Sequence, residues 1–166
     1  YHQNPRCQIN NVYWNTPNFY YKKAYSENTD LFFIDTVQLL PEHCSIGINK
    51  VMCVHNDNIM DIINKQLIWL DEELEKSSIK NKIVFGHYPI LTNGYYKNSL
   101  HNLYNLLYPI FKKHKVTAYV SGHEHNIQYI NRKYDELDFN QIIIGSSSEN
   151  RVDEANHQSC FECVND

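Results

Sequence analysis

Two short segments, each placing glycine before histidine directly after an apolar run, constrain this sequence most. The first is segment 86–89, Gly-His-Tyr-Pro, which follows the run 82–85. The second is segment 121–125, Ser-Gly-His-Glu-His, which follows the run 116–120. Apolar runs of this length predict buried β-strands, and glycine lets the chain turn tightly where a strand ends. The pattern therefore predicts imidazoles at the ends of two strands, where they can converge on one point.

The histidines of these segments, His87, His123 and His125, are candidate metal ligands. Neutral imidazole is a common ligand of zinc, iron and similar ions. The alternative is that such histidines only shape a turn, since the chain has nine histidines and most need no special role. Two strand ends of this form, one of them with His-Glu-His, favour the metal site. Glu124 is expected to point away from the metal, because neighbours in an extended segment face opposite sides.

The remaining sequence predicts an α/β fold, in which helices lie outside a sheet. Apolar residues recur at helical spacing in two segments and form strand-like runs in three others. We expect helices at 58–76 and 99–115, the second kinked at Pro109, and further strands at 31–37, 127–130 and 141–144. Residues 40–57 are interpreted as a surface insertion, and the polar tail from Gly145 predicts no element. No repeat or linker divides the 166 residues, so one domain is expected.

Charge and hydropathy exclude two classes of partner. The net charge of -4 gives no broad basic face for nucleic acid, and no apolar run is long enough to cross a membrane. Small anionic substrates stay possible, because a bound metal supplies its own positive charge. Asp35, at the end of the 31–37 run, is either catalytic or bonded to nearby loop backbone, and the second interpretation is favoured.

The two histidine segments resemble signature motifs of the calcineurin-like metallophosphoesterases, and in detail those of the tartrate-resistant, or purple, acid phosphatases. The resemblance covers about residues 4–145 in register. Further matching stretches occur in the same order as in that family: Asn4-Pro5-x-x-Gln8-Ile9, Trp14-Asn15-x-Pro17-x-x-Tyr20-Tyr21, Phe33-Ile34-Asp35-Thr36-Val37, Gln66-Leu67-x-Trp69-Leu70 and Val116-Thr117-Ala118-Tyr119.

This resemblance implies a four-layer α/β/β/α sandwich with two packed mixed sheets. It also implies an acid phosphatase that hydrolyses phosphate monoesters by a dinuclear metal-hydroxide mechanism. The two ions would be ferric iron and a divalent ion, which is iron, zinc or manganese. By resemblance, His87 and His123 would bind the divalent ion and His125 the ferric ion. The family places such enzymes in the secretory pathway, in the vacuole or lysosome, or outside the cell.

Two departures from the family pattern matter. The family's other metal ligands lie upstream of the position that Tyr1 matches, so residues 1–166 are expected to be the C-terminal portion of one domain, directly preceded by a Gly-Asn-His-Asp motif. On its own, such a portion is expected to be inactive. The second departure is Tyr96, which stands where some members have a histidine that assists the leaving group. Tyrosine can donate a hydrogen bond there but is a poor acid–base partner at low pH.

Two other functions remain open. One is a non-catalytic, phosphatase-like scaffold protein, although such proteins tend to lose metal ligands and this chain retains three histidines. The other is a metallophosphoesterase of another substrate class, such as a nucleotidase or phosphodiesterase. The matches in 14–21 and 35–37 favour the acid phosphatase branch.

Overall fold

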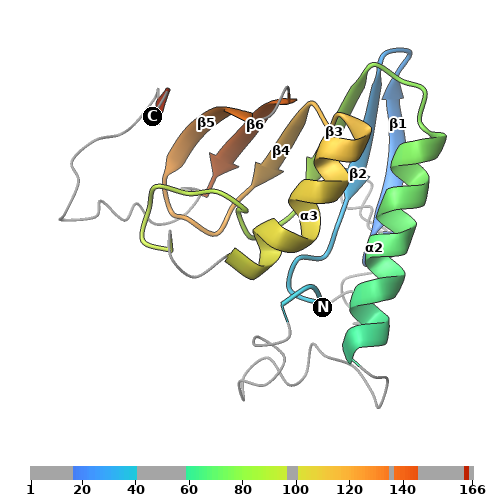
Figure 1. Cartoon of the computed structure of the whole chain (residues 1–166), viewed down its shortest axis with the longest axis horizontal. Helices are drawn as coiled ribbons and strands as arrows, with labels where there is room; N and C mark the ends of the chain where they lie inside the picture. Colours follow the sequence, from blue (N-terminus) through green and yellow to red (C-terminus); the bar gives the residue numbers. More distant parts are fainter. Residues whose placement is uncertain (1–16, 41–58, 97–100, 135–136, 146–162, 165–166) are drawn as a thin grey trace, which may run out of the picture.

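The computed structural model shows one mixed sheet with two helices (Figure 1). It describes residues 17–40, 59–96, 101–134, 137–145 and 163–164. The elements are β1 (Tyr21–Ser26), β2 (Thr29–Phe33), α2 (Ile59–Lys76), β3 (Asn81–Phe85), α3 (His101–His114), β4 (Ala118–Ser121), β5 (Ile127–Tyr134), β6 (Leu137–Ile144) and β7 (Cys163–Val164).

The strand order is β1-β2-β3-β4-β6-β5-β7. Strands β2, β3, β4 and β6 run parallel to one another, whereas β1 pairs antiparallel with β2 and β5 pairs antiparallel with β6. The crossovers through α2 and α3 both step the same way along the sheet. Right-handed crossovers then place both helices on the same face, as Figure 1 shows. The predicted α/β class is confirmed, and the four-layer arrangement stays a prediction, since the described residues form a single sheet.

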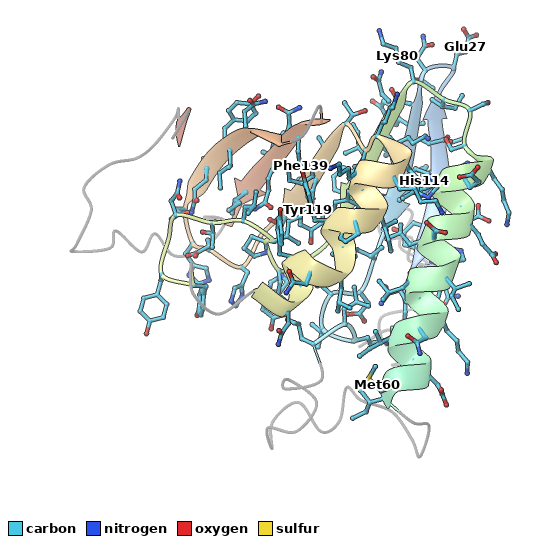
Figure 2. All side chains as sticks on the ribbon, viewed as in Figure 1. Glu27, Met60, Lys80, His114, Tyr119 and Phe139 are labelled. Carbon is cyan, nitrogen blue, oxygen red and sulfur yellow. The ribbon has the colours of Figure 1, made fainter. Side chains whose placement is uncertain are left out.

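The core lies between this sheet face and the two helices. Phe32, Val84 and Tyr119 are register partners on β2, β3 and β4, and all three are fully buried. The ring of Phe111 on α3 lies 5.6 Å from that of Tyr119 and 6.0 Å from that of Phe139. Figure 2 shows Tyr119 and Phe139 on the sheet beside α3. The apolar residues whose spacing predicted the two helices are buried and face this core. They include Ile63, Leu70, Leu74, Leu103 and Leu107.

Within the described residues, α2 agrees with the helix predicted at 58–76, and α3 ends one residue before the helix predicted at 99–115; positions 58, 99 and 100 lie outside those residues. Pro109 lies inside α3, on an exposed position, and the predicted kink stays a prediction. The helix ends at His114 because Lys115 adopts a left-handed conformation with φ of 53°. The amide of Val116 then donates to the carbonyl of Phe111 at 2.9 Å, which is a Schellman-type C-cap.

The predicted strand at 31–37 was too long at its C-terminal end, because β2 ends at Phe33. The carboxylate of Asp35 accepts hydrogen bonds from the amides of Val37 at 3.0 Å and Gln38 at 3.3 Å, which turns the chain. The preferred interpretation of Asp35, bonding to nearby loop backbone, is therefore confirmed. The predicted strands 127–130 and 141–144 are parts of β5 and β6, which are longer and form a hairpin.

The prediction that the tail from Gly145 holds no element was wrong. Strand β7 pairs parallel to β5, with Cys163 opposite Ile130. A two-residue strand owes its existence to this tertiary pairing rather than to any local pattern, so no sequence period could show it. The predicted insertion at 40–57 lies outside the described residues, except for Leu40, which is fully buried.

The opposite face of the sheet is also apolar. The rings of Tyr21 and Phe33 stack at 4.6 Å, and those of Phe33 and Phe85 at 5.0 Å. Toward β5 and β6 the same face continues to Ile127 and Ile144, which are 52% and 61% exposed. Neither α2 nor α3 covers this face (Figure 1). A second packed layer here would bury apolar surface, as the predicted sandwich requires.

A buried ion pair fixes the edge of the sheet away from the histidine segments. The carboxylate of Asp30 lies 2.9 Å from Nζ of Lys22 and accepts a 2.6 Å hydrogen bond from Ser77. Burial by itself raises the pKa of Asp30, but the hydrogen bonds from Lys22 and Ser77 and the charges of Lys22 and Lys82 outweigh it. The pKa of Asp30 therefore lies below its ordinary value of 3.8.

We expect Asp30→Asn to lower the free energy of unfolding at pH 7 by about 2 kcal/mol, because charged hydrogen bonds are lost in a buried place. Because the pKa of Asp30 is lower in the native than in the unfolded protein, its ionised carboxylate stabilises the fold at pH values above 3.8, the pKa of the unfolded protein. This contribution is lost as the pH falls through the native pKa. The difference between variant and parent should therefore shrink below about pH 4. Urea unfolding of metal-free whole protein at several pH values measures it. Glu27→Gln, at the exposed β1–β2 turn (Figure 2), is the control; equal stability of Asp30→Asn and parent at pH 7 would contradict the account.

Candidate metal centre

The two histidine segments meet at one edge of the sheet because β3 and β4 are adjacent and parallel. The amide of Gly86 donates a hydrogen bond to the carbonyl of Val120 at 3.0 Å. The amide of Gly122 donates one to the carbonyl of His87, also at 3.0 Å. These two bonds continue the strand pairing into the loops. The ring centroids of His87 and His123 lie 5.2 Å apart at a steep angle. The structure thus brings together two of the three predicted ligands.

The loop after β3 is hydrogen-bonded to the turn after β2. Oγ1 of Thr36, which is fully buried, accepts hydrogen bonds from the amides of His87 at 3.1 Å and Tyr88 at 2.9 Å. The turn itself is fixed by Gln66 of α2. Its Oε1 accepts from the amide of Asp35 at 2.7 Å, and its Nε2 donates to the carbonyl of Asp35 at 3.0 Å. A side chain of α2 therefore helps to position the backbone of His87, because it holds the turn that carries Thr36.

Gly86 is the residue that lets this loop approach so closely. A Cβ at this position would lie 2.3 Å from the hydroxyl oxygen of Tyr119 and 2.7 Å from Cγ2 of Thr36. That hydroxyl donates a 2.6 Å hydrogen bond to the carbonyl of Tyr88. Burial raises the pKa of Tyr119, so its hydroxyl stays a proton donor. Any larger residue at position 86 would push the histidine loop away from the core.

His123 has a left-handed backbone, with φ of 67°. The amide of Glu124 donates to the carbonyl of Gly122 at 2.8 Å, so His123 is the central residue of a tight γ-turn. A non-glycine residue in this region costs of order 1–3 kcal/mol and persists only where the surroundings impose it. Such strain is concentrated at functional sites, which is independent support for a role of His123.

Aromatic rings surround His123. The ring centroid of Tyr96 lies 4.2 Å from that of His123, and that of Tyr88 lies 4.4 Å from it. Tyr96, predicted from the resemblance to act near the leaving group, is therefore next to a predicted ligand. Its exposed neighbour Tyr95 contacts it edge-on at 5.0 Å. The role of Tyr96 in a reaction stays a prediction.

The state of His87 suits a metal ligand. Partial burial, the largest cause, and the nearby His125 lower its pKa, while the charge of Asp35 opposes them. The pKa of His87 therefore lies below its ordinary value of 6.5. His87 is therefore neutral at pH 7, which is the form of imidazole that binds metal.

The three histidines do not by themselves complete a site. Among the described residues, no three histidine, cysteine, aspartate or glutamate side chains are arranged to hold one ion. Nδ1 of His125 is buried. The donor type fits zinc or iron, and the side-by-side rings of His87 and His123 fit two ligands of one ion. A complete ligand set is therefore not present among the described residues.

Sequence reasoning missed the polar side chains that hold the first loop. Oε1 of Gln141, on β6, accepts hydrogen bonds from the amides of Ile90 at 3.2 Å and Leu91 at 2.9 Å, and its Nε2 donates to the carbonyl of Leu91. Gln141 is fully buried. A glutamine amid apolar residues of a strand was the available signal, because a buried amide must find partners.

Glu124 is a buried carboxylate of the second histidine loop. Its side chain is buried and its Oε1 accepts hydrogen bonds from Oγ1 of Thr92 and from the amide of Tyr96. These contacts tie Glu124 to segment 92–96, and its expected direction away from the metal stays a prediction.

Comparisons with known proteins bear on this site. Residues 9–126 match the Calcineurin-like phosphoesterase family, and the match includes both histidine segments. Tartrate-resistant acid phosphatase type 5 of Sus scrofa is 30% identical over 122 residues, which cover 70% of this chain and 35% of that protein. Purple acid phosphatase 3 of Arabidopsis thaliana is 30% identical over 123 residues, which cover 69% and 31%. The chain thus spans about a third of the length of these relatives.

A solved structure supports the fold. GAP50, described as the anchor in the inner membrane complex of Plasmodium, aligns with a TM-score of 0.59 at 27% identity, over 80% of this chain and 39% of that one. Within the described part of this chain, no helix is long and apolar enough to cross a membrane. The family match extends over most of the sequence and contains all three predicted ligands. We therefore conclude that the chain belongs to the calcineurin-like phosphoesterase family.

Proposed function

We propose that this chain is part of an acid phosphatase that hydrolyses phosphate monoesters at a dinuclear metal centre. One observation carries the proposal: His87 and His123, from adjacent strand ends, hold their rings 5.2 Å apart in a chain whose relatives are purple acid phosphatases. The lowered pKa of His87 and the imposed backbone of His123 support it. A site that served only to turn the chain would require neither.

In this proposal His87 and His123 hold the divalent ion, and His125 holds the ferric ion. Two such ions, when bound, would supply positive charge for the phosphate oxygens and would lower the pKa of the attacking water. The protein's own groups fix the geometry. Thr36 and Gly122 hold the backbone of His87, and Tyr96 lies against His123, where its hydroxyl can donate a hydrogen bond toward a leaving oxygen.

The proposed centre needs ligands beyond this chain's histidines. Three neutral imidazoles do not balance two cations with a total charge of about +5, and a bridge between two ions uses a carboxylate. The chain spans about a third of its curated relatives. We therefore propose that residues 1–166 supply one side of a single domain, complete only together with the rest of the whole protein. Its compartment would be the secretory pathway, the vacuole or lysosome, or the outside of the cell.

A scaffold protein is the second candidate function. The observation that favours it is the similarity to GAP50, whose description is that of an anchor. Retention of His87, His123 and His125 favours the enzyme instead. A third candidate is a nucleotidase or phosphodiesterase of the same family. Metal content separates the first two candidates, and a comparison of phosphate monoesters with diesters and nucleotides separates the third.

The three histidine variants should differ in a defined way. In the whole protein, His125→Ala should shift or bleach the visible band of the ferric centre and reduce turnover together. His87→Ala and His123→Ala should lose the divalent ion and most activity but keep that band, because each ion retains its other ligands. Metal analysis and an absorption spectrum measure both effects.

The control for this series is His114→Ala. His114 is a buried imidazole between the helices (Figure 2), with Nε2 2.7 Å from a carboxylate oxygen of Asp71. Its loss should lower stability but leave the metal content unchanged. Full metal occupancy and normal turnover in all three site variants would show that the histidine segments only shape the sheet edge.

The chain alone should bind at most one divalent ion, weakly, and lack phosphatase activity, because its ligand set is incomplete. It should also self-associate through the apolar sheet face around Phe33, Ile127 and Ile144. An assay with an aryl phosphate, in the presence of iron and zinc, together with sedimentation of the purified chain, tests both statements. Robust turnover by this chain would refute the proposed division of the site.

A further inference from the structure

We propose that Glu124 is a positioning residue. Its buried carboxylate joins segment 92–96 to the turn at His123, and so fixes the ring of Tyr96 against that of His123. The inference rests on the proposed use of His123 as a metal ligand, but its structural part can be tested without metal.

The carboxylate of Glu124 serves two donors of one segment. Its Oε1 accepts a 2.9 Å hydrogen bond from the hydroxyl of Thr92 and a 3.0 Å hydrogen bond from the amide of Tyr96. Glu124 is only 3% exposed, so water has little access to these donors and loss of the carboxylate would leave them unsatisfied. Because the second bond is made by the backbone of Tyr96 itself, the carboxylate sets where that ring can lie.

Segment 92–96 is shaped around this carboxylate. A Cβ at Gly94 would lie 2.6 Å from both carboxylate oxygens, so the absence of a side chain there makes the room that Glu124 fills. The amide of Gly94 donates to Oγ1 of Thr92 at 2.9 Å. Gln128 of β5 supports the same segment, since its Oε1 accepts from the amide of Asn93 at 3.0 Å and its Nε2 lies 3.2 Å from Oγ1 of Thr92. The segment is therefore fixed by side chains of the second histidine loop and the strand after it.

The other end of Glu124 adjoins the strained residue. Its amide closes the γ-turn centred on His123, at 2.8 Å from the carbonyl of Gly122. Its own carbonyl is packed so tightly that a Cβ at Gly145 would lie 1.6 Å from it. Next to it, the amide of Gly145 donates to the carbonyl of Asn126 at 3.1 Å, which continues the pairing of β5 and β6 toward the loop. Glu124 is thus anchored at both its side chain and its main chain, directly after the position that needs support.

Strain and anchor together explain the aromatic contact. A left-handed histidine relaxes when its surroundings loosen. Without the carboxylate, the amide of Tyr96 loses its acceptor, and the main chain directly after His123 loses its side-chain anchor to segment 92–96. Both rings of the 4.2 Å contact would then move. Residues that orient a metal ligand without touching the metal typically change its affinity by 10–100-fold.

The test uses the whole protein with Glu124→Ala and Glu124→Gln. Glutamine keeps an acceptor oxygen where Oε1 lies, whereas alanine removes it. In metal-free protein, the ring protons of His123 should show an upfield ring-current shift from Tyr96 in the NMR spectrum, assigned with a Tyr96→Leu variant. We expect this shift to be retained in Glu124→Gln and lost in Glu124→Ala. Zinc titrated into the same samples should bind about 10–100-fold more weakly to Glu124→Ala than to the parent.

Gln141→Ala is the matched control, because Gln141 is also buried and holds the same loop at Ile90 and Leu91, away from Tyr96. It should lower stability but keep the His123 signature. A retained signature and unchanged zinc affinity in Glu124→Ala would overturn the inference, as would equal loss of the signature in Gln141→Ala or in Glu124→Gln. If the parent binds no zinc, the proposed function fails, while the metal-free signature still decides the structural claim.

Discussion

Two backbone hydrogen bonds between the ends of β3 and β4 support everything else at this site. Gly86 pairs with Val120, and Gly122 pairs with His87, so the parallel pairing of the strands continues into both loops. Parallel strands deliver their carboxyl ends to one edge of a sheet, which is where α/β folds place their sites. The right-handed crossovers through α2 and α3 make this pairing possible and cover only one face. The meeting of the two histidine segments and the packing of the core therefore come from the same topology.

Most of the side-chain hydrogen bonds that hold the loops come from uncharged polar residues. Thr36, Gln141 and Gln128 each bond to loop amides from a buried position, and Gln66 fixes the turn that carries Thr36. Buried amides and hydroxyls stabilise a loop only when their partners are complete. This rigid frame is what can retain a left-handed histidine. Among the charged residues, the buried Glu124 also anchors a loop of the site, whereas the ion pair of Asp30 with Lys22 lies at the opposite end of the strands.

The sequence was sufficient for the features that depend on local pattern. Strand β3, both helices and the convergence of His87 and His123 follow from apolar periods and from glycine at strand ends. The bonding of Asp35 to its own turn was also predictable, because aspartate commonly binds amides two and three residues on. What failed depends on distant partners: the extra strand β7 requires β5, and the turn that ends β2 at Asp35 is held by Gln66 of α2, 31 residues away. The anchoring by Gln141 and Glu124 could not be predicted, since their partners lie 50–51 and 28–32 residues away.

The central claim is that His87 and His123 are ligands of one metal ion in a phosphoesterase domain. The most direct measurement is a crystal structure of the whole protein grown with zinc, with anomalous scattering recorded at the zinc edge. The account predicts an anomalous peak about 2.0–2.1 Å from one ring nitrogen of each histidine, with Tyr96 still packed on His123. An ordered site in which zinc binds elsewhere, or in which the two rings point apart, would contradict it.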